Sequence, residues 1–270
     1  DDALKREMEE LERGGIFRTL GIRNFLEGDF FKWYLHTWDA GVANAVRTLL
    51  DRLKDYDPGT LEVSPEQARD LLKKLYHRLM PGEIRHALGE YYTPDWLAEH
   101  VLNELGYEGQ TDKRLLDPAC GSGTFLVLAI KRLRDRCFQE GLNEQETLST
   151  ILNNIVGIDL NPLAAIAART NYLLALGDLL VHRTHEIDIP VYLADSILTP
   201  AAGQQLFNQD RYVINTAVGQ FDIPSCLKTH DQIDNLCNLL EECVASEVDG
   251  GVFLDRARQA LNIDNADWLG

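Results

Sequence analysis

Three short apolar segments, each carrying an aspartate near its end, constrain the fold of this chain more than any other feature. They are "RLLDPAC" (114–120), "NIVGIDL" (154–160) and "PVYLADS" (190–196). The stretches between them have helical periodicity, and strands that alternate with helices are typical of a parallel sheet covered on both faces. Ligands of such sheets bind beyond the carboxyl ends of the strands. We therefore predict an α/β fold in which Asp117, Asp159 and Asp195 lie along one edge of the sheet.

The regions on either side of these segments have different patterns. Residues 1–92 predict a helical N-terminal domain, in which "SPEQARDLLKKLYHRLM" (64–80) opens with a serine and a proline that suit the start of a helix. Residues 93–270 then form the domain that holds the sheet. Toward its end, "RYVINTAVGQFDIP" (211–224) predicts one or two strands, and acidic sequence with helical periodicity follows.

Composition excludes several classes of function. The five cysteines form no CxxC pair, and the HxxH of His182 and His185 has nothing nearby to complete a ligand set, so we expect no metal site. A net charge of −17 argues against a chain that grips a polyanion over its whole surface. No uninterrupted apolar stretch approaches the roughly 20 residues that span a bilayer, so we expect a cytoplasmic protein with no membrane partner.

The glycine turn in "LLDPACGSGTFLVLAI" (115–130) discriminates among three kinds of ligand. A Walker loop needs a lysine after its second glycine, and Gly123 is followed by Thr124. A dinucleotide-binding turn needs a third glycine, where this chain has Leu126. A nucleoside without phosphates remains, because glycines let a ligand approach the backbone closely. S-adenosylmethionine fits, since acidic surroundings favour its ammonium and sulfonium, and one carboxylate can accept both ribose hydroxyls.

Four segments together resemble the adenine-N6 DNA methyltransferases. The segment "DPACGSGTF" (117–125) resembles the first motif of that family, and "YYTP" (91–94) lies upstream where the family has an aromatic-Thr-Pro motif. The second and third motifs are matched by "GIDLNPLAAIAARTNYLLA" (157–175) and "LADSIL" (193–198). Their order is similar to that in type I and type IIG restriction-modification systems. The resemblance implies a Rossmann-like, S-adenosylmethionine-dependent methyltransferase domain with a partial parallel sheet, preceded by an α-helical N-terminal domain.

The resemblance also implies roles for individual residues. The upstream motif would close over the methionine end of the cofactor with Tyr92, Thr93 and Pro94. The floor under the cofactor would be formed by Asp117, Ala119, Cys120, Gly121, Gly123 and Thr124, with Asp117 assisting the amino group. Asp159 would accept both ribose hydroxyls, and Leu160 would pack on the adenine. Asp195 would accept a hydrogen bond from the adenine amino group, with Ile197 as an apolar neighbour.

Each role has a structural alternative. Thr93 and Pro94 can cap the helix that follows them. Asp117 can serve only to organise its turn, and Asp195 can be a solvated loop aspartate. For Asn161 and Pro162 we prefer the structural interpretation, a helix N-cap followed by a proline at the first helical position.

The catalytic motif of the family, an Asp, Asn or Ser followed by two prolines and an aromatic residue, is absent from the sequence. In the family, this motif bonds the amino group of an adenine flipped out of the duplex and stacks on its ring. We therefore predict no catalytic residue in this chain. We interpret it as a fragment, inactive alone, of a larger enzyme whose partners are double-stranded DNA and restriction or specificity subunits or domains.

Two other hypotheses stay open. The chain can be a non-catalytic module that binds cofactor or protein in a regulatory role, or the same scaffold can methylate RNA or protein. A tetrapeptide like NPPY downstream of Gly270 would favour the DNA methyltransferase. The sequence predicts neither the DNA target nor the oligomeric state, because target specificity depends on contacts to base edges made elsewhere.

Overall fold

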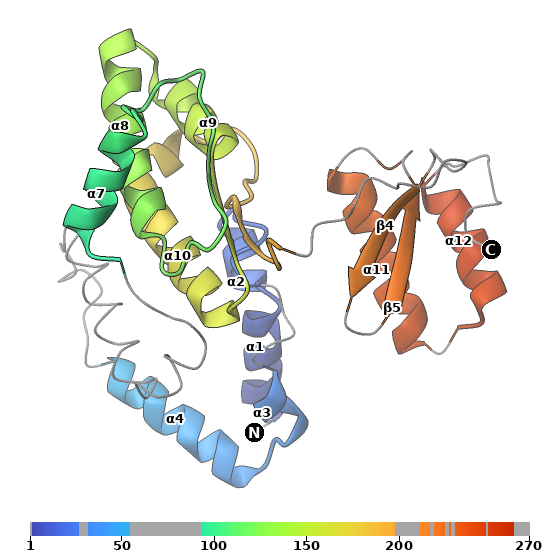
Figure 1. Cartoon of the computed structure of the whole chain (residues 1–270). Coiled ribbons are helices and arrows are strands. Elements are labelled where there is room, and N and C mark those ends of the chain that lie inside the picture. Colours follow the sequence, from blue (N-terminus) through green and yellow to red (C-terminus); the bar gives the residue numbers. More distant parts are fainter. Residues whose placement is uncertain are drawn as a thin grey trace. The chain divides into compact units, whose positions relative to one another are not determined.

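A computed structural model of the chain describes residues 2–26, 32–54, 93–197, 211–216, 219–224, 227, 230–246 and 248–261. The chain divides into two compact units, residues 1–196 and 197–270, whose elements are labelled in Figure 1. This division falls inside the range 93–270, which the sequence predicted as one domain. The predicted boundary after residue 92 and the predicted helix at 64–80 lie outside the described residues.

The first unit contains a parallel sheet with the strand order β1-β2-β3. Its strands are β1 (Leu115–Asp117), β2 (Ile155–Asp159) and β3 (Val191–Leu193). Each strand is shorter than the segment that predicted it, but all three strands and their parallel pairing are confirmed. Asp117 pairs with Gly157 and Asp159 with Leu193, so both aspartates lie at the carboxyl edge. The fold is therefore helix-rich around a small parallel sheet.

The described part of the first unit also contains α helices and one 3₁₀ helix. They are α1 (Asp2–Glu12), α2 (Gly15–Thr19), α3 (Trp33–His36), α4 (Ala40–Lys54), α7 (Asp95–Glu104), α8 (Thr124–Glu140), α9 (Glu144–Asn154) and α10 (Pro162–Leu176), with the 3₁₀ helix η2 (Gly177–His182). The start of α10 confirms the predicted cap, because the Asn161 side chain accepts a hydrogen bond from the Leu163 amide at 2.9 Å and Pro162 is the first helical residue. At α7, Pro94 is the N-cap and makes no side-chain bond.

One face of the sheet carries the core. Helix α8 packs against β1 and β2, α10 packs against β2 and β3, and the two helices contact each other (Figure 1). Ile155 and Val191 point to this face and are fully buried. On the opposite face, Leu116 is 57% exposed and Tyr192 is 37% exposed. Val156 and Ile158, which lie between them on the same face, are partly buried, and the expectation of a sheet covered on both faces stays a prediction for this second face.

Helix α10 is strongly apolar. Together with η2 it forms a stretch, Pro162–His182, that is long and apolar enough to cross a membrane by length and composition. It packs in the core of the first unit, however, and it carries two polar side chains, Arg169 and Asn171, that are each 2% exposed. Buried polar groups that hydrogen-bond to neighbouring protein are expected inside a globular domain. We therefore assign α10 as a core helix.

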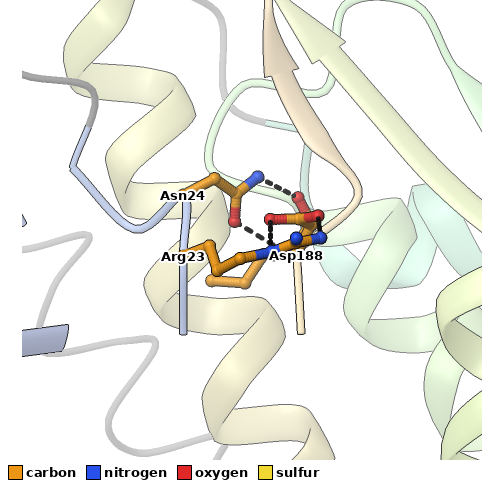
Figure 2. Close-up of polar contacts among 4 residues, drawn as sticks. Arg23, Asn24 and Asp188 are labelled. Atoms are coloured by element: carbon orange, nitrogen blue, oxygen red, sulfur yellow. Dashed lines mark hydrogen bonds and ion pairs between the residues drawn. The ribbon is translucent and has the colours of Figure 1, made fainter. Parts of the chain in front are cut away.

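The N-terminal segment is joined to the stretch that leads into β3. Ile22 and Ile187 form a parallel bridge, and both are buried. Figure 2 shows the polar contacts beside it: the Arg23 guanidinium pairs with both carboxylate oxygens of Asp188. The Asn24 amide donates to the Ile189 carbonyl at 2.8 Å and accepts from the Ile189 amide at 2.7 Å. Residues 21–25 thus belong to the same compact unit as the sheet.

The second unit consists of a hairpin and two helices. The antiparallel strands are β4 (Arg211–Thr216) and β5 (Gly219–Pro224), and the helices are α11 (His230–Ala245) and α12 (Gly250–Leu261). A small cluster of buried residues, namely Leu227, Leu236, Ala257 and Leu261, forms its core. The prediction of one or two strands followed by helical sequence is confirmed.

Candidate functional site

The turn between β1 and α8 is held against the end of β2. The Cys120 amide donates to the Ile158 carbonyl at 2.9 Å, and the Gly123 amide donates back to the Cys120 carbonyl at 2.8 Å. Gly121 and Gly123 have φ angles of 54° and 84°, in the left-handed region that favours glycine. A Cβ at Gly121 would meet no protein atom within 4 Å, so the space beside this residue is open.

Asp117 brings a partly satisfied carboxylate to this turn. Its Oδ1 accepts a hydrogen bond from the Ala119 amide at 3.2 Å, whereas its Oδ2 is buried and has no hydrogen-bonding partner among the described residues. Burial raises the pKa of Asp117, the Ala119 bond partly offsets this, and the negative charge of Asp159 raises it further. A cation or a hydrogen-bond donor beside the unpartnered Oδ2 would stabilise the ionised form of this carboxylate.

Asp159 connects two loops at the carboxyl edge. Its Oδ2 accepts a hydrogen bond from the Gly121 amide at 2.7 Å, and its Oδ1 accepts one from the Asn161 amide at 2.8 Å. One carboxylate therefore fixes both the glycine turn and the start of α10. The Asp159 carbonyl also accepts from the Ala194 amide at 3.0 Å, which brings the segment with Asp195 beside the end of β2.

The other predicted residues of the turn differ in exposure. Cys120 and Thr124 are 5% and 8% exposed, and Ala119 lies at the surface. Burial, with the charges of Asp159 and Asp117, raises the pKa of the Cys120 thiol well above its ordinary range, so this sulfur is a packing group. Leu160, directly after Asp159, is 69% exposed and presents an apolar surface next to the strand end.

The structure does not bring all predicted residues together. Tyr92 lies outside the described residues. Thr93 and Pro94 precede α7, which packs along α8, and the hydrogen bonds of the described residues do not link them to the glycine turn. Ile197 is the first residue of the second unit, so it is not part of the site as defined within the first unit. The roles of these four residues stay predictions.

A family model described as N-6 DNA Methylase matches residues 67–216, which is more than half of the chain. The chain belongs to this family. The match includes β1, β2, β3 and β4, and it contains the segments at 117–125, 157–175 and 193–198 that carried the resemblance.

Relatives of the chain include a restriction enzyme methylase subunit and an adenine-specific methyltransferase. The type I restriction enzyme EcoEI methylase subunit of Escherichia coli is 24% identical over 219 residues, covering 77% of this chain and 40% of that protein. The adenine-specific methyltransferase PglX of Streptomyces coelicolor is 28% identical over 146 residues, covering 48% of this chain and 12% of that protein. Among solved structures, a DrdV–DNA complex has a TM-score of 0.46 at 16% identity, covering 72% of this chain and 20% of that one.

These relatives confirm the resemblance to adenine-N6 DNA methyltransferases of the restriction-modification kind. The chain spans less than half of the length of either curated relative.

Sequence reasoning missed two buried polar residues on α10 that support the site. The Asn171 amide donates to the Ser122 carbonyl, inside the glycine turn, at 2.8 Å. The Arg169 guanidinium donates to the Val191 carbonyl at 2.9 Å and to the Phe25 carbonyl at 3.3 Å. A signal was available, because "AARTNYLLAL" places these residues inside an otherwise apolar helix. The polar residues in this apolar helix do not predict which main-chain carbonyls Arg169 and Asn171 contact.

Proposed function

We propose that the first unit has a Rossmann-like methyltransferase fold and binds S-adenosylmethionine at the turn formed by residues 117–124. The observation that carries the proposal is the buried, unpartnered Oδ2 of Asp117 next to a glycine turn with open space at Gly121. S-adenosylmethionine offers a cation, a ribose and an adenine within one molecule. The family to which the chain belongs uses a methyl donor, which supports this choice of ligand.

The charge of Asp117 suits the methionine end of the cofactor. Its ionised form is disfavoured by burial and by the charge of Asp159. An ammonium group bound at the unpartnered Oδ2 would favour that ionised form and supply the missing hydrogen-bond donor. The open space at Gly121 would let the cofactor approach the backbone without a side chain in the way.

The ribose and adenine would lie further along the carboxyl edge. Both carboxylate oxygens of Asp159 accept a hydrogen bond from a main-chain amide. Each oxygen has a second lone pair that can accept a hydrogen bond from a ribose hydroxyl. Leu160 offers an exposed apolar side chain for the adenine ring. Asp195 follows Ala194, whose amide donates a hydrogen bond to the Asp159 carbonyl, and it would accept a hydrogen bond from the adenine amino group.

The reaction that we propose for the whole protein is methyl transfer from the sulfonium of the cofactor to N6 of adenine in DNA. This chain would hold and orient the donor, and the sequence contains no polar-Pro-Pro-aromatic motif to position the acceptor base. We propose double-stranded DNA and restriction or specificity subunits as partners, in the cytoplasm. With a net charge of −17, the chain would contribute at most a local patch to DNA binding.

Calorimetric titration of the chain with S-adenosylmethionine tests the proposal. Asp117→Asn keeps the shape of the side chain and an oxygen for the Ala119 amide, but it removes the charge. We expect it to weaken binding roughly tenfold or more, because a charge-assisted hydrogen bond is lost. The matched control is Asp135→Asn, a carboxylate exposed on α8, which should leave the affinity unchanged.

Asp159 is a poor choice for this test, because its replacement would release the Gly121 and Asn161 amides and disturb the turn itself. A chain that circular dichroism shows to be folded, and that gives no binding to S-adenosylmethionine, would contradict the proposal. Equal affinities of the parent and the Asp117→Asn chain would contradict the role of Asp117.

A further inference from the structure

Three polar side chains of α10 are buried, and each reaches a main-chain carbonyl of a different neighbour. Arg169 donates to Val191 at the start of β3. The Tyr172 hydroxyl lies 3.1 Å from the carbonyls of Ile151 and Ile155, where α9 meets β2. Asn171 alone of the three contacts the glycine turn, through the Ser122 carbonyl at 2.8 Å.

The peptide between Ser122 and Gly123 is held at both ends. Its N–H donates to the Cys120 carbonyl at 2.8 Å, and its carbonyl accepts from Asn171. This peptide follows Gly121 and precedes the left-handed Gly123, and glycines permit rotations that other residues oppose sterically. The hydrogen bond from Asn171 on α10 therefore restricts rotation of this peptide, which the two neighbouring glycines would otherwise allow.

Stability alone does not explain an asparagine at position 171. Its side chain is 2% exposed, and its Oδ1 is buried without a hydrogen-bonding partner among the described residues. A buried unsatisfied acceptor destabilises a fold, so the cost of burying Oδ1 offsets what the bond to Ser122 contributes to stability. Residues that break a local packing rule are typical of functional positions.

We propose that Asn171 is a positioning residue for the cofactor site: it fixes the Ser122–Gly123 peptide and thereby the shape of the turn that receives the ligand. This role rests on the proposed function, since it concerns the same turn. Asn171 acts through Ser122 and does not itself touch the cofactor. Together with the Asp159 bond to the Gly121 amide, it holds the turn from a second direction.

The test compares Asn171→Leu with Asn24→Leu in the full chain. Asn24 is a matched control, because it also donates from Nδ2 to a main-chain carbonyl at 2.8 Å, but at Ile189. We expect Asn171→Leu to weaken S-adenosylmethionine binding roughly tenfold in calorimetry, the effect of leaving a buried hydrogen-bonding partner unpaired. Asn24→Leu should lower the urea midpoint and leave the affinity unchanged.

Hydrogen exchange without ligand separates positioning from general destabilisation. Asn171→Leu should speed exchange in the peptide covering residues 117–125, and Asn24→Leu should instead speed exchange around residues 187–191. If Asn171→Leu does not fold, Asn171→Ser, which is too short to reach Ser122 and leaves room for water, replaces it in both measurements.

The outcomes are distinguishable. An unchanged affinity of the Asn171 variant, or an equal loss of affinity in both variants, would overturn the positioning role. If the parent chain fails to bind S-adenosylmethionine, the proposed function fails, and the exchange experiment still decides whether Asn171 fixes the turn. Unchanged exchange over residues 117–125 in the Asn171 variant would overturn the inference on its own.

Discussion

Replacing Gly121 by alanine separates the conformational role of this glycine from its role toward a ligand. The added methyl would contact no protein atom within 4 Å, so overpacking does not contribute. The φ angle of 54° remains unfavourable for alanine, by about 1 kcal/mol. Binding of S-adenosylmethionine should be weakened in addition to this loss of stability, because the methyl group occupies the space proposed for the cofactor. An overpacked contact of roughly 1–3 kcal/mol corresponds to an affinity loss of about 5-fold to 150-fold.

Gly106 provides the matched control for this substitution. Its φ angle is 62°, a Cβ there would also meet nothing within 4 Å, and it follows α7 at a distance in sequence from the turn. Urea unfolding should show similar losses of stability for Gly106→Ala and Gly121→Ala, about 1 kcal/mol each. Calorimetry with S-adenosylmethionine should show weakened binding only for Gly121→Ala. Full affinity in the Gly121→Ala chain would refute the placement of the cofactor beside this residue.

Three further substitutions test other parts of the first unit. The pKa of Asp117 is raised in the folded protein, so its ionised form opposes folding and the free energy of unfolding should increase as pH falls through that pKa. Asp117→Asn should raise the urea midpoint at neutral pH and abolish this pH-dependent increase. Gly157→Ala would place a Cβ 2.7 Å from Cδ1 of Leu126, and thermal unfolding should show a loss of about 1–3 kcal/mol. Tyr172→Phe removes a hydroxyl that serves two main-chain carbonyls, and urea unfolding should show a loss of about 1–2 kcal/mol.

Much of the sheet and part of the site were predictable because their signals are local. An apolar run that ends in an aspartate predicts a strand end, and Asp117 and Asp159 do lie at the carboxyl edge of the sheet. The cap at Asn161 and Pro162 was predictable for the same reason, since it depends on two adjacent residues. The four ordered motifs predicted the family that the sequence comparison then confirmed.

Other features depend on contacts that leave no local trace. The Asp159 carboxylate accepts two main-chain hydrogen bonds because the glycine turn lies against the end of β2. From the sequence alone, an aspartate at a strand end is equally consistent with binding a ligand. The pairing of Asn24 with Ile189 joins residues 165 positions apart, which a periodicity argument does not reach.

The pairing of residues 21–25 with the entry to β3 also has a consequence for the order in which the chain is made and folded. Synthesis at roughly 5–20 residues per second means that Asn24 waits about 10–30 seconds before Ile189 exists. Contacts of such long sequence separation slow folding, although the entropy of closing the loop grows only slowly with its length. Residues 21–25 thus pair only after a long stretch of intervening chain has been made, and a ligand that covered them, or their deletion, would leave residues 187–189 without these partners.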